Sequence, residues 1–259
     1  MPPQGSLRIQ QVLANAGIAS RRHSEQLVKE GRITLSGQPI TTLGFKIRRD
    51  QHRDLRIDGQ QLPSSPKKTV YVLLYKPDGF ISSTSDPQGR PTVLDLLPSG
   101  LPRLYPVGRL DFHTEGLLLL TNDGALTQSL LHPRFHVSKL YEVKVKGIPK
   151  SSDLRLLCEG IGKDKERMVA IRAEILRKGI QNAWLQIEIE QGRYHQVRKM
   201  CERIGHPVQK LKRVSLGPIK LGKLRPGKWR FLSQKEVAQL ENASRVQSPQ
   251  LCCGVSERI

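Results

Sequence analysis

A stretch poor in apolar residues divides this chain into two unequal parts. Residues 54–68 contain two prolines, two serines and a glycine, and a strand-like apolar run begins directly after them. Glycine and proline at this density end regular structure and mark turns or linkers. A chain of 259 residues is long enough for one medium domain beside a small one. We therefore expect a small domain over residues 1–65, a larger one over 66–240, and a disordered tail over 241–259.

The positive charge of the chain is concentrated in two segments. The whole sequence carries 43 Lys and Arg against 23 Asp and Glu, a formal net charge of +20. Residues 1–53 hold nine basic and three acidic residues, and residues 193–230 hold twelve and one, whereas the middle of the chain is nearly balanced. A charge that served only solubility would be spread more evenly. Two basic segments favour a polyanionic partner, and nucleic acid is the usual one.

Other features limit the classes of protein to consider. No apolar run approaches the roughly 18 residues of a membrane helix, and the opening residues lack the apolar core of a signal peptide. The four cysteines lack the paired spacing of a zinc site or a disulfide framework. Motifs of nucleotide hydrolysis, dinucleotide binding, zinc proteolysis and serine hydrolysis are absent from the sequence. We expect a cytoplasmic protein, monomeric, with no metal and no membrane contact.

The first basic segment has the pattern of helix, tight turn, helix, strand and turn. Apolar residues at helical spacing predict a first helix that Gly17 ends, and Ser20 is placed to cap a second helix over 21–30. Ile33 and Leu35 then alternate with polar residues, as in a strand. The string LANAGIASRRHSEQLVKEGRITLSGQPI resembles the S4 domain, an RNA-binding fold, and the resemblance covers about residues 7–54.

Four basic residues of this segment become candidate RNA contacts. By the resemblance to the S4 domain, Arg8, Arg21, Arg22 and Lys29 would bind the RNA backbone. Arg21 and Arg22 also stand at the start of the second helix, where free backbone N–H groups favour phosphate. A DNA-binding helix-turn-helix is an alternative, although the strand that follows fits an S4 domain better. Plain solvated arginines are the other alternative.

The larger part mixes strand and helix patterns without the regular alternation of a Rossmann fold. Tyr141, Val143 and Val145 alternate onto one face of a predicted strand. The residue patterns predict strands over 69–75, 80–83, 117–121, 140–146, 169–176 and 184–190, and helices over 125–132, 152–159 and 194–204. We expect an α+β domain with a long, mostly antiparallel sheet.

One loop before the strand at 117–121 carries a carboxylate, Asp111. Alone, it could be a helix cap or a turn former. The surrounding string GRLDFHTEGLLLLTNDG, however, resembles the central motif of bacterial ribosomal RNA pseudouridine synthases of the RsuA/RluB type. Three further strings resemble motifs of that family in the same order, namely YKPDGFISS, HPRFHVSKLYEVKVKG and the stretch that begins GRYHQVRKM. With the S4-like segment included, the resemblance covers about residues 7–235.

The resemblance implies a role for each matching residue. Asp111 stands at the position of the catalytic aspartate, Tyr141 at that of the tyrosine that stacks on uridine, and Arg198 at that of the basic partner of the aspartate. Arg109 stands at a position whose residue, in the wider family, helps to displace the target base. From residue patterns alone, Tyr141 would belong to the core and Arg198 to the solvated surface. Cys201 belongs to the apolar stripe of its helix and is expected to pack rather than react.

These residue types suit the chemistry that the resemblance implies. Pseudouridine formation breaks an N–C glycosidic bond, rotates the freed uracil and rejoins it through carbon, so it needs no redox cofactor. The step requires an ionised carboxylate near C1′, as nucleophile or to assist proton removal. A carboxylate in a buried site keeps its charge when a guanidinium pairs with it, and Arg198 is expected to do so bidentately. The target nucleotide must also be flipped out of the RNA, and stacking on Tyr141 would return about 1–3 kcal/mol.

The predicted function is therefore an isomerase that converts a specific uridine of ribosomal RNA to pseudouridine without a cofactor. The motif GHPVQKLKRV favours 23S large-subunit RNA over 16S small-subunit RNA as the substrate. An alternative of a different class is a non-catalytic assembly factor that binds ribosomal RNA and keeps the fold.

Overall fold

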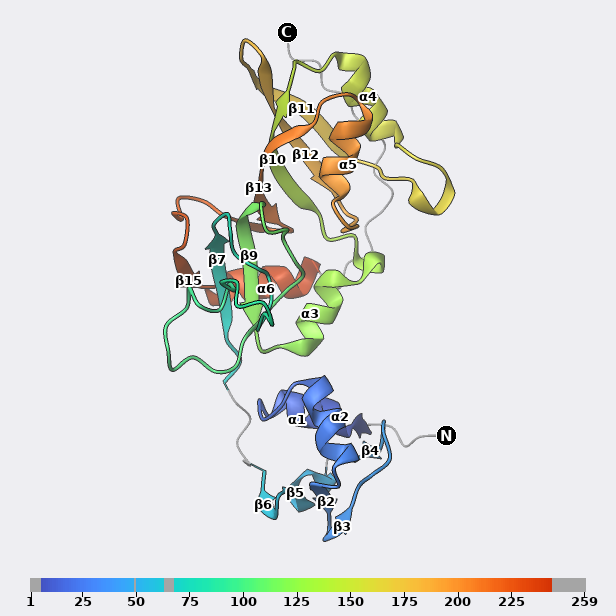
Figure 1. Ribbon diagram of the computed structural model, residues 1–259, viewed down its shortest axis with the longest axis vertical. Coiled ribbons are helices and arrows are strands. Elements are labelled where there is room, and N and C mark those ends of the chain that lie inside the picture. Colours follow the sequence, from blue (N-terminus) through green and yellow to red (C-terminus); the bar gives the residue numbers. More distant parts are fainter. Residues whose placement is uncertain (1–5, 49, 63–67, 244–259) are drawn as a thin grey trace. The chain divides into compact units, whose positions relative to one another are not determined.

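The computed structural model describes residues 6–48, 50–62 and 68–243 and divides the chain into two compact units, Met1–Val70 and Tyr71–Ile259 (Figure 1). The domain break predicted near residue 65 falls among residues 63–67, outside the described ranges. Of the tail predicted over 241–259, the first three residues belong to a helix that ends at Ala243, and the remainder, with its Cys252–Cys253 pair, also lies outside the described residues.

The first unit packs two short helices and two small sheets around its own core. Ser20 accepts a hydrogen bond from the backbone N–H of His23 at 3.0 Å, and so caps the second helix as predicted. The elements are β1 (Leu7–Arg8), α1 (Ile9–Asn15), α2 (Arg21–Lys29), β2 (Ile33–Leu35), β3 (Gln38–Pro39), β4 (Lys46–Ile47), η1 (Asp50–Asp54), β5 (Leu55–Ile57) and β6 (Gln60–Gln61). β1 pairs with β4, and the other sheet has the order β3-β2-β5-β6. The core includes Ile9, Leu13, Val28, Ile33, Ile47 and Leu55.

The second unit is built on one long sheet with the order β11-β12-β10-β13-β9-β7-β15. All neighbours along this path are antiparallel except β9 and β13, which are parallel. The α+β class and the mostly antiparallel sheet that the sequence predicts are therefore confirmed. The strands are β7 (Tyr71–Lys76), β8 (Tyr105–Pro106), β9 (Glu115–Thr121), β10 (Lys139–Lys146), β11 (Arg172–Lys178), β12 (Asn182–Ile189), β13 (Val208–Leu216), β14 (Ile219–Lys220) and β15 (Trp229–Phe231).

Helices and a shared apolar core support this sheet. Along β10, Tyr141, Val143 and Val145 are all buried, as their alternation predicts. The helices are α3 (Gly124–Leu131), α4 (Ser151–Glu159), α5 (Gln196–Arg203) and α6 (Gln234–Ala243), with single 3-10 turns at η2 (Pro133–Phe135) and η3 (Asp164–Glu166). Leu126 and Leu130 of α3 and Leu240 of α6 pack with the leucines of β7 and β9 in one cluster.

One predicted strand is not formed and one long strand was missed, each for an identifiable reason. Residues 80–83, predicted to pair with β7, form only an isolated bridge between Ile81 and Thr92, because β9 and β15 occupy the two edges of β7. Strand β13 was not predicted, since its apolar residues do not alternate regularly. The ladder between β10 and β13 shifts register at two points, and such bulges add a residue that breaks the two-residue period.

The sheet has two halves that meet at one short contact, which we call the seam. There Glu115 and Gly116 of β9 pair in parallel with Lys212 and Arg213 of β13. β7, β8 and β15 lie on the β9 side, and β10, β11, β12 and β14 lie on the β13 side. Gly116 has a φ of +107°, and a Cβ at this position would collide with the backbone carbonyl oxygen of Arg213. Glycine is therefore what allows the two halves to approach.

The substitution Gly116→Ala is expected to lower the free energy of unfolding by about 2–5 kcal/mol, because it adds both backbone strain and overpacking. The matched control is Gly222→Ala, whose φ is +61° but whose Cβ would meet nothing within 4 Å. That control carries only the left-handed backbone cost of about 1–2 kcal/mol. Urea unfolding followed by circular dichroism measures both. Equal losses for the two variants would show that close approach at the seam is unimportant.

Candidate active site

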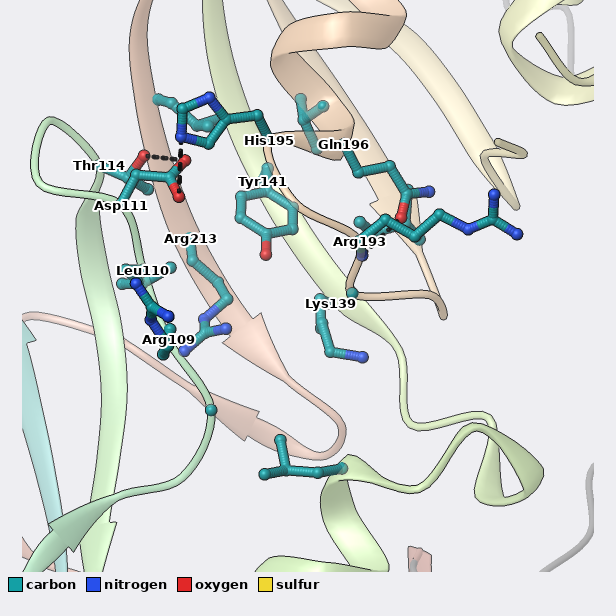
Figure 2. Close-up of a pocket in the computed structure, with 16 residues that line it drawn as sticks. Arg109, Leu110, Asp111, Thr114, Lys139, Tyr141, Arg193, His195, Gln196 and Arg213 are labelled. Atoms are coloured by element: carbon teal, nitrogen blue, oxygen red, sulfur yellow. Dashed lines mark hydrogen bonds and ion pairs between the residues drawn. The ribbon is translucent and has the colours of Figure 1, made fainter. Parts of the chain in front are cut away.

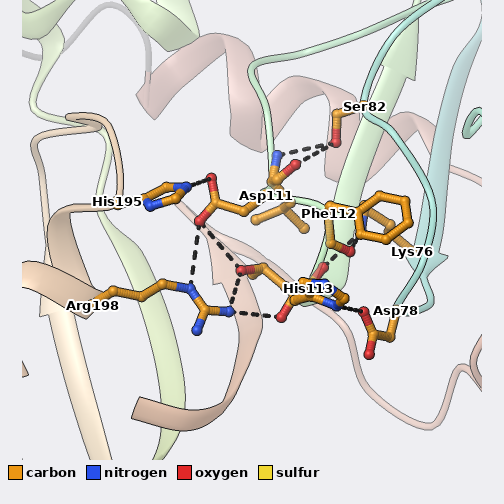
Figure 3. A network of polar contacts seen from close by, with 10 residues as sticks. Lys76, Asp78, Ser82, Asp111, Phe112, His113, His195 and Arg198 are labelled. Carbon is orange, nitrogen blue, oxygen red and sulfur yellow. Dashed lines mark hydrogen bonds and ion pairs between the residues drawn. The ribbon is translucent and has the colours of Figure 1, made fainter. Parts of the chain in front are cut away.

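Asp111 lies on a loop that leads into β9, and hydrogen bonds hold this loop in place (Figure 3). The hydroxyl of Ser82 donates to the carbonyl oxygen of Leu110 at 2.9 Å and accepts from the Leu110 N–H at 3.1 Å. The backbone N–H of Thr114 donates to the carbonyl oxygen of Asp111 at 3.0 Å, which closes a turn. The carboxylate is one-third exposed. The loop therefore presents it at an accessible but defined place.

A buried lysine, Lys76, also binds this loop. Lys76, the last residue of β7, is fully buried, and its Nζ donates to the carbonyl oxygens of Pro77, Phe112 and Thr114 at 3.1, 3.1 and 2.8 Å. Burial lowers the pKa of Lys76 to about 8, so the ammonium form persists at neutral pH. Sequence reasoning assigned no role to Lys76, although it stands in the string YKPDGFISS. The signal that could have identified Lys76 is its position as the last residue of a buried strand.

Two side chains from α5 and its start face the carboxylate of Asp111 (Figure 3). His195 Nε2 lies 3.4 Å from Oδ1, and Arg198 Nε lies 3.8 Å from Oδ2. The bidentate pairing expected for Arg198 is wrong. Its Nη2 instead donates to the carbonyl oxygen of His113 at 2.7 Å and to the hydroxyl of Thr114 at 3.3 Å. Arg198 thus ties α5 to the loop and approaches the carboxylate through one nitrogen.

His195 is a site residue that the sequence motifs did not predict. It occupies the N-cap position of α5 with a left-handed φ of +54°, and its ring stacks on Tyr194 with centroids 3.9 Å apart. The signal that could have found it is its place in the same string as Arg198. His113, although close to Asp111 in sequence, is exposed and contacts Asp78 at 2.9 Å instead.

An open cavity lies beside Asp111 (Figure 2). Its walls come from the Asp111 loop, from β10, from the start of α5 and from β13. Tyr141 of β10 lines it while only 8% exposed, so this residue is both core and cavity wall. Arg109 lines it from the loop and is exposed. The structure therefore brings Asp111, Tyr141 and Arg109 around one space, with Arg198 against the carboxylate. Lys139 and Arg213, which sequence reasoning also missed, line the same cavity.

The remaining four predicted residues belong to the first unit. Arg8, Arg21, Arg22 and Lys29 are all exposed. Arg22 and Lys29 are seven residues apart on α2, which places them on one face of that helix. Their basic side chains are thus available to a ligand in solution.

Cys201 is fully buried in the apolar stripe of α5, and burial raises its pKa to about 12, which keeps it an inert thiol. Within the described ranges, no three His, Cys, Asp or Glu residues are grouped closely enough to hold a metal ion. Among those residues, every helix is also too short or too polar to cross a membrane.

Comparison with protein families finds two matches along the chain. Residues 70–203 match the model of the RNA pseudouridylate synthase family, and residues 7–52 match the model of the S4 domain. The first match contains Asp111, Tyr141 and Arg198, and the second contains all four candidate residues of the first unit.

Individual proteins agree with these family matches. The chain is 42% identical over 235 residues to the ribosomal large subunit pseudouridine synthase B of Bacillus subtilis, covering 90% of this chain and 95% of that one. It is 40% identical over 238 residues to an uncharacterized RNA pseudouridine synthase of Aquifex aeolicus, covering 92% and 94%. A crystal structure of a pseudouridylate synthase matches with a TM-score of 0.63 and 28% identity, over 90% of this chain and 99% of that chain. The chain therefore belongs to the RNA pseudouridine synthases, as a member that carries an S4 domain ahead of its synthase domain.

Proposed function

We propose that this enzyme converts a uridine of large-subunit ribosomal RNA to pseudouridine, with Asp111 as its catalytic carboxylate. The observation that carries the proposal is the position of Asp111 at the edge of a cavity walled by the buried ring of Tyr141. His195 and Arg198 flank the carboxylate at 3.4 and 3.8 Å, so a negative charge is matched there by basic groups.

The reaction needs little more than such a carboxylate. The N1–C1′ bond of the uridine breaks, the uracil turns, and a C5–C1′ bond forms. The C5 proton leaves and N1 gains a proton, so atoms and electrons balance without an oxidant or a reductant. Asp111 acts at the sugar, either by bonding to C1′ or by assisting the loss of a ribose proton. Both routes require the ionised form of the carboxylate.

The other site residues serve access and binding. A base within RNA structure is out of reach, so the nucleotide must be extruded into the cavity at a cost of a few kcal/mol. Stacking against Tyr141 returns about 1–3 kcal/mol of that cost. Arg109 is exposed on the loop at the cavity, and its proposed role is to occupy the position that the extruded base leaves. Arg198 and Thr114 fix the loop that carries the carboxylate.

The assignment to large-subunit RNA rests on the Bacillus subtilis relative, which is named for that subunit and matches over 90% of this chain. The basic segment 193–230 adjoins the cavity through His195 and Arg213 and suits the RNA backbone on either side of the target. The S4 domain at residues 7–52, an RNA-binding fold, supports an RNA substrate as well.

The direct test uses 23S and 16S RNA transcribed in vitro, which contain no modified bases. Each is incubated with the purified protein, and pseudouridine is mapped by carbodiimide modification and reverse transcription. We expect product at a single site in 23S RNA and none in 16S RNA. Product in 16S RNA alone would contradict the proposed substrate but support the proposed activity. Tight binding to 23S RNA without any product would instead support a non-catalytic assembly factor.

For the S4 domain we expect that Arg21→Gln combined with Arg22→Gln weakens RNA binding and flattens its salt dependence. Each lost phosphate contact should reduce the slope of log K against log salt by about one. The matched control is Arg32→Gln, because Arg32 is already held by Asp58 through hydrogen bonds of 2.6 and 2.8 Å. Filter binding between 50 and about 200 mM salt measures the slopes. Equal slopes for the double variant and the wild type would exclude Arg21 and Arg22 as contacts.

A further inference from the structure

A buried guanidinium faces the cavity with part of its hydrogen-bonding capacity unused. Arg213 of β13 is only 3% exposed, and its Nε donates to the backbone carbonyl oxygen of Leu117 at 2.8 Å. Its Nη2 is buried and has no hydrogen-bond partner among the described atoms. A buried donor left unpaired costs about 1–3 kcal/mol. Such a cost is recovered when a ligand supplies the acceptor.

A second cation lies in the same wall. Lys139 is on β10 two residues before Tyr141, and Tyr141 is the direct cross-strand partner of Arg213. The three side chains therefore project from one face of the sheet. The Nζ of Lys139 donates to the carbonyl oxygens of Val137 and Glu190 at 2.9 and 2.6 Å, which leaves one of its three N–H groups for another acceptor. Burial, together with the nearby charge of Arg213, lowers the pKa of Lys139 to about 8.

The arrangement separates charge along the cavity. In Figure 2 the carboxylate of Asp111 and the ring of His195 lie at one end, and the hydroxyl of Tyr141 points toward the space between Arg213 and Lys139. A uracil ring that stacks on Tyr141 with its C1′ near Asp111 would direct its carbonyl edge toward these two cations. Both cations are donors only, so they match carbonyl oxygens and not amino groups.

We propose that Arg213 and Lys139 form a subsite for the detached uracil anion, in which they donate hydrogen bonds to its carbonyl oxygens. This inference rests on the function proposed above. When the N1–C1′ bond breaks, its electron pair stays on the base and the negative charge spreads to the O2 and O4 atoms. Donors already aimed at developing charge stabilise a transition state more than a ground state. No proton is transferred to Arg213 or Lys139 in this step.

The first test compares Arg213→Gln, Lys139→Met and wild type in full-length protein on an RNA with one target uridine. We expect RNA affinity to change by less than about threefold, whereas the single-turnover rate falls roughly 10²–10³-fold for Arg213→Gln. Circular dichroism melts identify a variant that fails to fold. Should Arg213→Gln unfold because it loses its bond to Leu117, Lys139→Met carries the comparison.

The second test separates contact with the base from mere support of the fold. The target uridine is replaced by 2-thiouridine or by 4-thiouridine. Sulfur accepts hydrogen bonds weakly, and the thiouracil anion is more stable than the uracil anion. Both effects shrink the advantage of the wild type over the variant, and we expect the ratio of their rates to fall at least tenfold with one of the two analogues.

The outcomes distinguish this inference from the function on which it rests. Wild-type protein that forms no pseudouridine in 23S or 16S RNA contradicts the proposed function itself. If the wild type is active but the ratio of wild-type to variant rate is the same for uridine and both analogues, then Arg213 and Lys139 have only a structural role. That result overturns the proposed subsite. Folded variants with wild-type rates overturn it as well.

Discussion

Replacing Asp111 with asparagine is expected to reduce pseudouridine formation by roughly 10³-fold or more. Asparagine keeps the shape of the side chain and its place beside His195 and Arg198. It carries no negative charge, however, and can neither bond to C1′ as a carboxylate nor accept a ribose proton. The measurement is the single-turnover rate on 23S RNA, with product mapped at the target site.

The same substitution should leave RNA affinity equal or higher, because it removes a negative charge close to RNA phosphates. The matched control is Asp78→Asn. Asp78 is also a carboxylate near the loop, but it is exposed and contacts only His113 among the interactions shown in Figure 3. We expect its rate to stay within about threefold of wild type. Full activity in Asp111→Asn would remove the central residue of the proposed mechanism, and equal loss in both variants would indicate a general effect of charge.

Replacing Lys76 with methionine is expected to lower the free energy of unfolding by about 3 kcal/mol or more. Methionine has a similar length but no donor, so three backbone carbonyl oxygens lose the ammonium that now binds them. Unpaired buried acceptors cost about 1–3 kcal/mol each. Because two of these carbonyls belong to the loop that carries Asp111, the turnover rate should fall as well. Urea unfolding and the single-turnover rate measure the two effects.

An exposed lysine provides the reference for this prediction. Lys178 is the exposed last residue of β11. Lys178→Met removes the same charge but leaves the three carbonyl oxygens that Lys76 binds with their donor. We expect a change within about 0.5 kcal/mol for this control. If Lys76→Met unfolds at the same urea concentration as the control, then the three hydrogen bonds contribute little and the loop is held by Ser82 and Arg198 instead.

The sequence predicts well those features that depend on neighbours in the chain. The helix that Ser20 caps and the alternation of Tyr141, Val143 and Val145 are both local patterns, and the structure has both. The family strings also brought Asp111, Tyr141 and Arg109 into one hypothesis, and the structure places them around one cavity.

Features that depend on pairing between distant segments could not be predicted in this way. The register between β10 and β13 places Arg213 opposite Tyr141. Bulges in this ladder break the alternation of β13, so its sequence does not show a strand pattern. Lys76 stands in one of the family strings, but two of its three acceptors, the carbonyl oxygens of Phe112 and Thr114, belong to a loop much later in the chain. The bidentate contact expected for Arg198 failed because Thr114 and the carbonyl oxygen of His113 compete for its terminal nitrogen.

The seam has a consequence for how the enzyme gains activity during folding. Asp111 comes from the half of the sheet that contains β9, whereas Tyr141, His195 and Arg198 come from the half that contains β13. The only strand pairing that joins the halves within the described residues is the one at Glu115 and Gly116. An intermediate in which both halves have formed but have not yet docked would show near-native circular dichroism and yet possess no complete site. Recovery of catalysis should therefore lag behind recovery of secondary structure and report the final docking of the two halves.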